Sequence, residues 1–140
     1  MKPKSTLKKR LEHHTTTLAK LMCGEKGFVE KIHNPPFVFH TMNRSAVMLM
    51  AREFGITSPE LKKKITNIFN QATNQRLRGE TISESYFRSR VVKLVTSETS
   101  LTDKKAKEFF SAVNGCLLHL TREVPKEIGI RQKTRNKDLE

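Results

Sequence analysis

Between residues 42 and 82, the apolar positions follow the period of an amphipathic helix, stop, and then follow it again. The first run keeps the i, i+3, i+4, i+7 spacing that places side chains on one helix face. Its members are Val47, Met50, Ala51 and Phe54. Gly55 comes next, and a glycine at this point can adopt the left-handed conformation that closes a helix. The pattern predicts a helix that ends at Gly55.

The second run opens with signals for a helix N-terminus. Thr57 and Glu60 have the spacing of a capping box, and Pro59 falls in the first turn, where its missing N–H is not needed. The apolar face that follows consists of Leu61, Ile65, Ile68, Phe69 and Ala72. The polar positions expected outside it are Lys62, Lys63, Lys64, Asn67, Asn70 and Asn74. We expect a helix of about five turns that ends near Leu77, because residues 78–79 interrupt the pattern.

A shift of 45 residues brings the same pattern back between about residues 87 and 124. The matched positions are Val47 with Val92, Met50 with Val95, Ile56 with Leu101, Thr57 with Thr102, Leu61 with Ala106, Ile65 with Phe110, Ile68 with Val113 and Ala72 with Leu117. Such a repeat indicates two copies of one helical hairpin, each of which needs the other to bury its apolar face. The alternative is that two amphipathic helix pairs share their period by chance.

The remaining segments predict shorter elements. A helix from about Ser5 to Met22 is indicated by Leu7, Leu11, Leu18 and Leu21. The prolines at 35–36 should prevent a helix, so residues 37–39 are expected to be extended and packed against the helices. Ser83 can cap a further helix, and the last long helix has the cleanest stripe in the chain. That stripe consists of Ala106, Phe109, Phe110, Val113, Cys116, Leu117 and Leu120.

The expected fold is therefore all-α, with about five helices in two tandem hairpins that form one compact domain with basic flexible ends. Residues 1–40 are assigned to a basic arm, a helix and an extended linker. Residues 41–124 form the tandem hairpin domain. Pro125 and Gly129 are expected to end the ordered structure, which leaves residues 125–140 as a basic tail.

Short motifs inside the repeat point to a known family. The first copy contains Met42-Asn43-Arg44-Ser45, Gly55-Ile56-Thr57 and Arg78-Gly79-Glu80, and the second contains residues 91–95, Ser100-Leu101-Thr102 and Lys105-Ala106. Both copies resemble the N-terminal helical half of the HU/IHF family of bacterial DNA-bending proteins. The resemblance covers about 80 of the 140 residues. It implies the family's dimer-forming helical core, with a homodimer or an HU-like protein as the partner.

The chain departs from that family where the family contacts DNA. The family continues into a β-saddle and two arms, each with an Asn-Pro that wedges into the minor groove. No such segment follows either copy here, and Asn34-Pro35 lies upstream of the helices, where we interpret it as a turn. The family's DNA-contacting residues therefore have no counterpart in this sequence.

The charge of the chain indicates a polyanionic partner. It has 27 Lys and Arg against 14 Asp and Glu, a formal net charge of +13. Such an excess attracts phosphates and releases condensed counterions regardless of base sequence. We therefore expect a small architectural or regulatory protein that binds DNA by backbone and shape, with RNA left open. The candidate binding residues are Lys2, Lys4, Lys8, Lys9, Arg10, Lys62, Lys63, Lys64, Arg76 and Arg78.

Two other interpretations stay open. Ala51, Gly55 and Leu61 have the spacing of a helix-turn-helix, whose second helix reads the major groove. That helix would present Ser58, Glu60, Lys62, Lys63 and Asn67. The polar Lys64 at a usually apolar position and the length of the helix count against it. The other interpretation is a protein-interaction module that binds an HU-like partner or a second copy of itself.

Motifs of enzymes and metal sites are missing from the sequence. It has no Gly-rich phosphate loop, nucleophile elbow or His-Glu-x-x-His run, so we expect no enzymatic activity and no cofactor. Neither Cys23 with His33 and His40 nor the pair His13-His14 has the spacing of a zinc site, so no metal is expected. The absence of an 18-residue apolar run and of a signal-peptide centre predicts a cytoplasmic protein, nucleoid-associated if bacterial.

Overall fold

The computed structural model describes the backbone of residues 6–22 and 35–139 and the side chains of residues 6–20 and 37–130. These residues form five α-helices and contain no strand. The helices are α1 (Leu7–Met22), α2 (Pro35–Glu53), α3 (Pro59–Leu77), α4 (Glu84–Glu98) and α5 (Asp103–Leu139). The all-α fold and the number of helices are as the sequence predicts.

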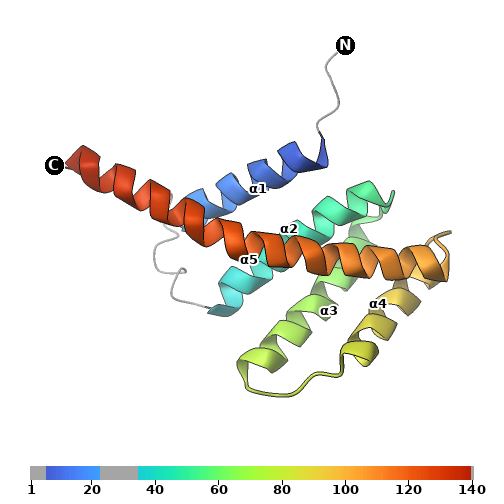
Figure 1. The fold of residues 1–140 in the computed structure, drawn as a ribbon. Helices are drawn as coiled ribbons and strands as arrows, with labels where there is room; N and C mark the ends of the chain where they lie inside the picture. Colours follow the sequence, from blue (N-terminus) through green and yellow to red (C-terminus); the bar gives the residue numbers. More distant parts are fainter. Residues whose placement is uncertain (1–5, 23–34, 140) are drawn as a thin grey trace, which may run out of the picture.

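The longest helix, α5, lies across the other helices and packs against α1, α2 and α4 (Figure 1). The two predicted hairpins are α2–α3 and α4–α5. They contact each other through α2 with α5 and through α3 with α4, while α1 packs on α2 and α5. The hairpins thus form one body, as expected from helices that each expose an apolar stripe.

Glycines end α2 and α3 in the same way. Gly55 and Gly79 have φ of 73° and 79°, the left-handed region that side chains with a Cβ rarely adopt. The amide of Ile56 donates to the carbonyl of Ala51 at 2.8 Å, and the same bond recurs after Gly79. This i to i+5 pattern satisfies carbonyls that a helix end leaves free. Both predicted helix ends are confirmed.

The predicted cap of α3 is wrong by one residue. The N-cap is Ser58, not Thr57, because Pro59 occupies the first helical position and the cap must directly precede it. The Ser58 hydroxyl accepts a hydrogen bond from the amide of Leu61 at 3.2 Å. The other predicted capping hydroxyls, which belong to Ser83 and Thr102, are confirmed.

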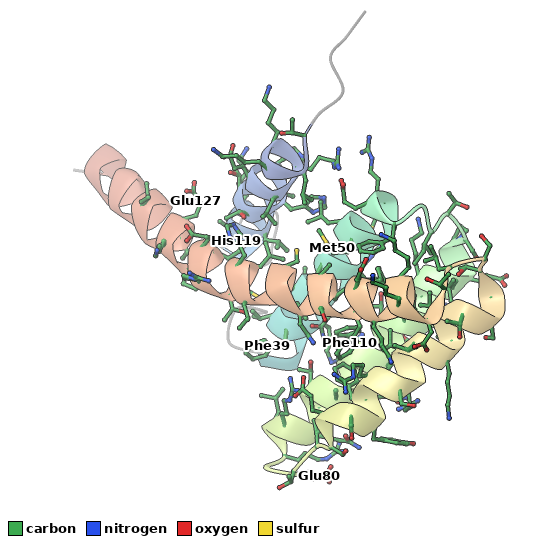
Figure 2. The ribbon with its side chains drawn as sticks, turned by 45° about the vertical axis from the view of Figure 1, so that its right-hand side comes forward. Phe39, Met50, Glu80, Phe110, His119 and Glu127 are labelled. Carbon is green, nitrogen blue, oxygen red and sulfur yellow. The ribbon has the colours of Figure 1, made fainter. Side chains whose placement is uncertain are left out.

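Phenylalanines join the two hairpins into one core. Phe69 of α3, Phe87 of α4 and Phe110 of α5 form a three-ring cluster whose centroids lie 4.8 to 5.8 Å apart. Figure 2 shows Phe110 pointing from α5 into the space beside α3 and α4. Ile65, which matches Phe110 in the repeat, is also fully buried in the same core. The expectation that both residues lie in one shared core is confirmed.

The extended stretch predicted at residues 37–39 is wrong, because α2 begins at Pro35 and includes it. A proline in the first turn of a helix loses no hydrogen bond, so these prolines start a helix instead of preventing one. Thr41 donates its hydroxyl proton to the carbonyl of Phe37 at 2.8 Å, one turn earlier. Helix α2 therefore crosses the boundary that the sequence suggested at residues 40 and 41.

The predicted end of ordered structure at Pro125 is also wrong, since α5 continues through it to Leu139. Leu120 and Val124 are fully buried and Ile128 packs against the core, which extends the apolar stripe past the proline at i+4 spacing. An interior proline removes one backbone hydrogen bond and kinks or breaks many helices. The burial of residues on both sides offsets that cost here.

We expect Phe110→Ala to lower the free energy of unfolding by about 3–5 kcal/mol, because it removes the ring that contacts both Phe69 and Phe87. Amide hydrogen exchange should show lost protection in α3 as well as in α5. The control is Tyr86→Ala, which removes an aromatic ring that is 65% exposed and should cost under about 1 kcal/mol. Full protection of α3 in the Phe110 variant would show that the hairpins fold independently.

Candidate nucleic-acid interface

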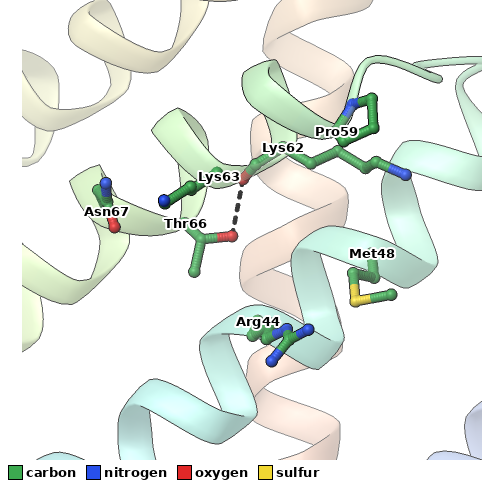
Figure 3. A pocket seen from close by; sticks show the side chains of 7 residues that line it. All are labelled: Arg44, Met48, Pro59, Lys62, Lys63, Thr66 and Asn67. Carbon is green, nitrogen blue, oxygen red and sulfur yellow. Dashed lines mark hydrogen bonds between the residues drawn. The ribbon is translucent and has the colours of Figure 1, made fainter.

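A hollow between α2 and α3 gathers positive charge from both helices. We call it the basic groove, and it has a volume of about 530 Å³. Its lining residues are Arg44, Met48, Pro59, Lys62, Lys63, Thr66 and Asn67 (Figure 3). Two come from α2 and five from the first half of α3, so the groove depends on how these helices pack.

The positive charge of the basic groove is not neutralised by any side chain that the structure describes. Among the described residues, no acidic side chain lines the groove. Arg44, Lys62 and Lys63 also form no ion pair with any described residue. Clustered cations with no acidic partner raise the local positive potential and attract anions. The groove is therefore suited to bind a group such as a phosphate.

The other side chains of the groove carry no charge, and two of them are apolar. Met48 is 44% exposed, although it is large and apolar, and Pro59 adds a second apolar surface. The Thr66 hydroxyl donates to the carbonyl of Lys62 at 2.8 Å, so its proton is used within α3. The exposed amide of Asn67 can donate and accept. The groove thus combines three cations with exposed apolar surface.

A buried polar contact fixes α2 against α3 and so positions the groove. Asn43 is only 4% exposed, and its amide donates at 3.0 Å to both Asn70 and Thr73 of α3. One turn away, His40 and Asn74 are joined by a hydrogen bond of 2.8 Å. These bonds set the register of the two helices, which brings Arg44 beside the α3 lysines. Asn70 and Asn74 thus contact α2, although the sequence pattern placed them outside the apolar face.

The predicted binding residues do not form a single surface. Lys62 and Lys63 share the basic groove, but Lys64 points elsewhere and pairs with Glu98 of α4 at 3.1 Å. Arg78 pairs with Glu80 at 3.3 Å, and Arg76 lines a different hollow. The structure therefore brings together two of the five predicted cations of α3 and its C-terminal end.

The cations of α1 do not line the groove either. Lys8 and Lys9 are exposed on α1, whereas Arg10 is half-buried and forms an ion pair with Glu53 of α2. Arg10 thus holds α1 on α2. The predicted contacts of Lys2 and Lys4 lie outside the described residues.

Sequence reasoning missed Arg44 as a groove residue. The available signal was its spacing, because Arg44 and Met48 are one helical turn apart and lie off the apolar stripe of α2. That spacing alone does not reveal that Lys62 and Lys63 come from another helix to meet them.

Titratable groups lie outside the basic groove as well. Within residues 6–20 and 37–130, no three His, Cys, Asp or Glu side chains gather as metal ligands. Burial, and then the nearby His13, lower the pKa of His14. Burial raises the pKa of the Cys116 thiol to about 11, so this thiol stays protonated and unreactive near neutral pH. The possible ligands Cys23 and His33 lie outside the described residues.

Comparisons with other proteins do not assign a function. No family model, curated protein or solved structure matches this chain. Within the described residues, no helix is both long and apolar enough to cross a membrane. The function must therefore be inferred from the groove and from the charge of the chain.

Replacement of Asn43 by alanine should lower the free energy of unfolding by about 1–3 kcal/mol, because Asn70 and Thr73 lose a partner in a buried place. Chemical denaturation measures this change. Asn67→Ala is the matched control, since Asn67 is exposed on the same side of α3, and it should change stability by under about 0.5 kcal/mol. Equal, small effects of both changes would mean that the Asn43 contacts do not hold α2 and α3 together.

Proposed function

We propose that this protein binds nucleic acid, DNA foremost, and that the basic groove contacts the sugar-phosphate backbone. One observation carries the proposal: Arg44 of α2 and Lys62 and Lys63 of α3 meet in one groove, and none of them has an acidic partner among the described residues. The net charge of +13 supports it, because a long-range positive field steers a polyanion toward the protein. The proposed role is architectural or regulatory and involves no catalysis.

The lining of the groove favours contacts with the backbone over contacts with base edges. Lysine and arginine contacts to phosphates fix position and orientation but carry no sequence information. A helix-turn-helix would insert the start of α3 into the major groove, with Ser58 and Glu60 facing the bases. The Ser58 hydroxyl already caps α3, and a carboxylate such as Glu60 repels phosphates unless it accepts a hydrogen bond from a base. Sequence reading by α3 is the second candidate.

Binding should therefore depend steeply on salt. Each phosphate that a protein neutralises adds about 0.9 to the slope of log affinity against log salt concentration on double-stranded DNA. The triple variant Arg44→Ala, Lys62→Ala, Lys63→Ala should lower that slope by about 2.7 if all three residues contact phosphates. Its affinity should fall by a similar factor on two duplexes of unrelated sequence. Fluorescence anisotropy titrations over a range of salt concentrations measure both quantities.

The matched control removes the same charge elsewhere. The variant Lys105→Ala, Lys107→Ala, Lys126→Ala also lowers the net charge by three, but these lysines pair with Glu108, Asp103 and Glu123 at 3.0 to 3.4 Å. It should keep most of the salt slope of the wild type. An equal loss in both variants would mean that only net charge matters, and a salt-insensitive affinity would remove the nucleic-acid proposal.

The same titrations separate the other candidates. A loss of discrimination between the two duplexes in the groove variant, with little loss of overall affinity, would favour sequence reading by α3. Tighter binding to an RNA duplex than to DNA would identify RNA as the ligand and leave the proposed role of the groove unchanged. The resemblance to the HU/IHF helices also suggests an HU-like protein as partner, and this becomes the better candidate if neither nucleic acid binds at low salt.

A further inference from the structure

One side of α4 carries an aromatic ring beside two cations. Tyr86, Arg90 and Lys93 have i, i+4 and i+7 spacing, which places them within about 60° of one another around the helix. All three side chains are exposed, and Tyr86 is 65% exposed. Neither cation forms an ion pair with a described residue. We call these three side chains the α4 face.

Contacts within the protein hold the ring and one of the cations. The guanidinium carbon of Arg90 lies over the Tyr86 ring, 5.9 Å from the ring centroid. At this distance a cation is attracted by the electrons of the ring. Arg90 also donates from Nη1 to Oε1 of Gln71 in α3 at 3.1 Å. An arginine has five N–H donors, so Arg90 keeps others that can donate to a ligand.

The α4 face is connected to the basic groove along α3. Helices α3 and α4 lie side by side (Figure 1). Lys63, Asn67 and Gln71 are exposed and follow one another at intervals of four residues, so they form one row on α3. Lys63 and Asn67 line the basic groove, and Gln71 contacts Arg90 of the α4 face. The row spans about 12 Å at the usual helical rise, so one bound strand can contact both the groove and the α4 face.

The acidic side chains of α4 lie away from this face. Glu84 is about 160° from Tyr86 around the helix, and Glu98 pairs with Lys64 of α3 at 3.1 Å. One exposed tyrosine on a protein surface is ordinary. Here the exposed ring adjoins two cations that have no acidic partner among the described residues, and a row of side chains leads from it to the basic groove. This combination suits a nucleotide, because a base can stack on the ring while the cations contact phosphates.

We propose that the α4 face binds an unpaired base, so that the preferred ligand of this protein is a nucleic acid with a single-stranded segment. The base stacks on Tyr86, and Arg90 and Lys93 contact the adjacent phosphates. In a duplex the bases stack on one another, and only an unpaired base can offer its face to a side chain. The inference rests on the proposed function, because the same strand continues into the basic groove.

The fluorescence of Tyr86 tests the stacking directly. Tyr86 is the only tyrosine of the chain, which has no tryptophan, so the intrinsic fluorescence reports on this position. Titration of the full chain with oligothymidine at low salt should quench it, because stacking places a base in contact with the excited ring. A DNA duplex of the same length should change it little when equally saturating. Free tyrosine amide in the same solutions corrects for light that the strands absorb.

Replacement of the ring separates stacking from charge. Tyr86→Ala should weaken the binding of oligothymidine by about tenfold or more and leave the affinity for the duplex unchanged. Tyr86→Phe keeps an aromatic ring and should bind as the wild type does. Leu118→Ala is the matched control, because Leu118 is 67% exposed on α5 and does not belong to the α4 face. It should change neither affinity, and circular dichroism checks that each variant is folded.

The outcomes distinguish this inference from the proposed function. Unchanged Tyr86 fluorescence when oligothymidine is bound, or equal affinities of the wild type and Tyr86→Ala for it, would overturn the role of the α4 face. Duplex binding through the basic groove would stand in that case. Failure of both nucleic acids to bind at low salt would overturn the proposed function itself. The fluorescence titration uses the wild-type chain, so it decides the question even if a variant fails to fold.

Discussion

The structure depends on the burial of one stripe of α5, because this helix packs against α1, against its own hairpin partner α4 and against α2 of the other hairpin. Its side chains face α1, α2 and α4, and Phe110 reaches Phe69 of α3. An isolated helical hairpin exposes most of its apolar face, whereas two hairpins that share a core bury both. Helix α5 packs against α2, which forms one wall of the groove between α2 and α3.

Besides the apolar core, a buried polar contact also constrains how α2 packs against α3. Asn43 is the one buried polar residue among the described side chains, and its bonds to α3 are directional. Apolar stripes alone permit sliding by a helical turn, but a buried amide must find its partners at a single register. The register places a cation of α2 beside two cations of α3. A contact that contributes modestly to stability thus determines where positive charge collects.

The sequence alone was sufficient to predict the features that depend on neighbouring residues, such as helix ends and apolar stripes. The helix ends at Gly55 and Gly79 follow from left-handed backbone, and the stripes follow from helical period. The errors at residues 35–39 and at Pro125 have a common cause, because each proline was treated as a break. In α2 the prolines lie in the first turn, where they are compatible with a helix. In α5 the helix continues through Pro125 because Val124 and Ile128 are buried against the core. Burial is a tertiary property, and a single sequence shows it only indirectly.

The candidate site was harder to predict than the fold for the same reason. The lysine run at 62–64 is visible in the sequence, but helical geometry sends Lys64 to Glu98 and the other two to Arg44. Lys62 and Lys63 differ from Lys64 in having no acidic neighbour among the described residues, and this difference depends on the packing of α2, α3 and α4. Cations that the protein pairs internally are less available to a ligand than cations that it leaves without a partner.

The most direct test of this account is to map the contact surface in solution. Backbone and side-chain chemical shifts of the labelled protein can be followed by NMR during titration with a short DNA duplex at low salt. The account predicts that the largest shifts occur at Arg44, Met48, Lys62, Lys63 and Asn67 and disappear together as salt is added. Shifts confined to α1 or to the first turns of α5, with the α2–α3 groove unchanged, would contradict it.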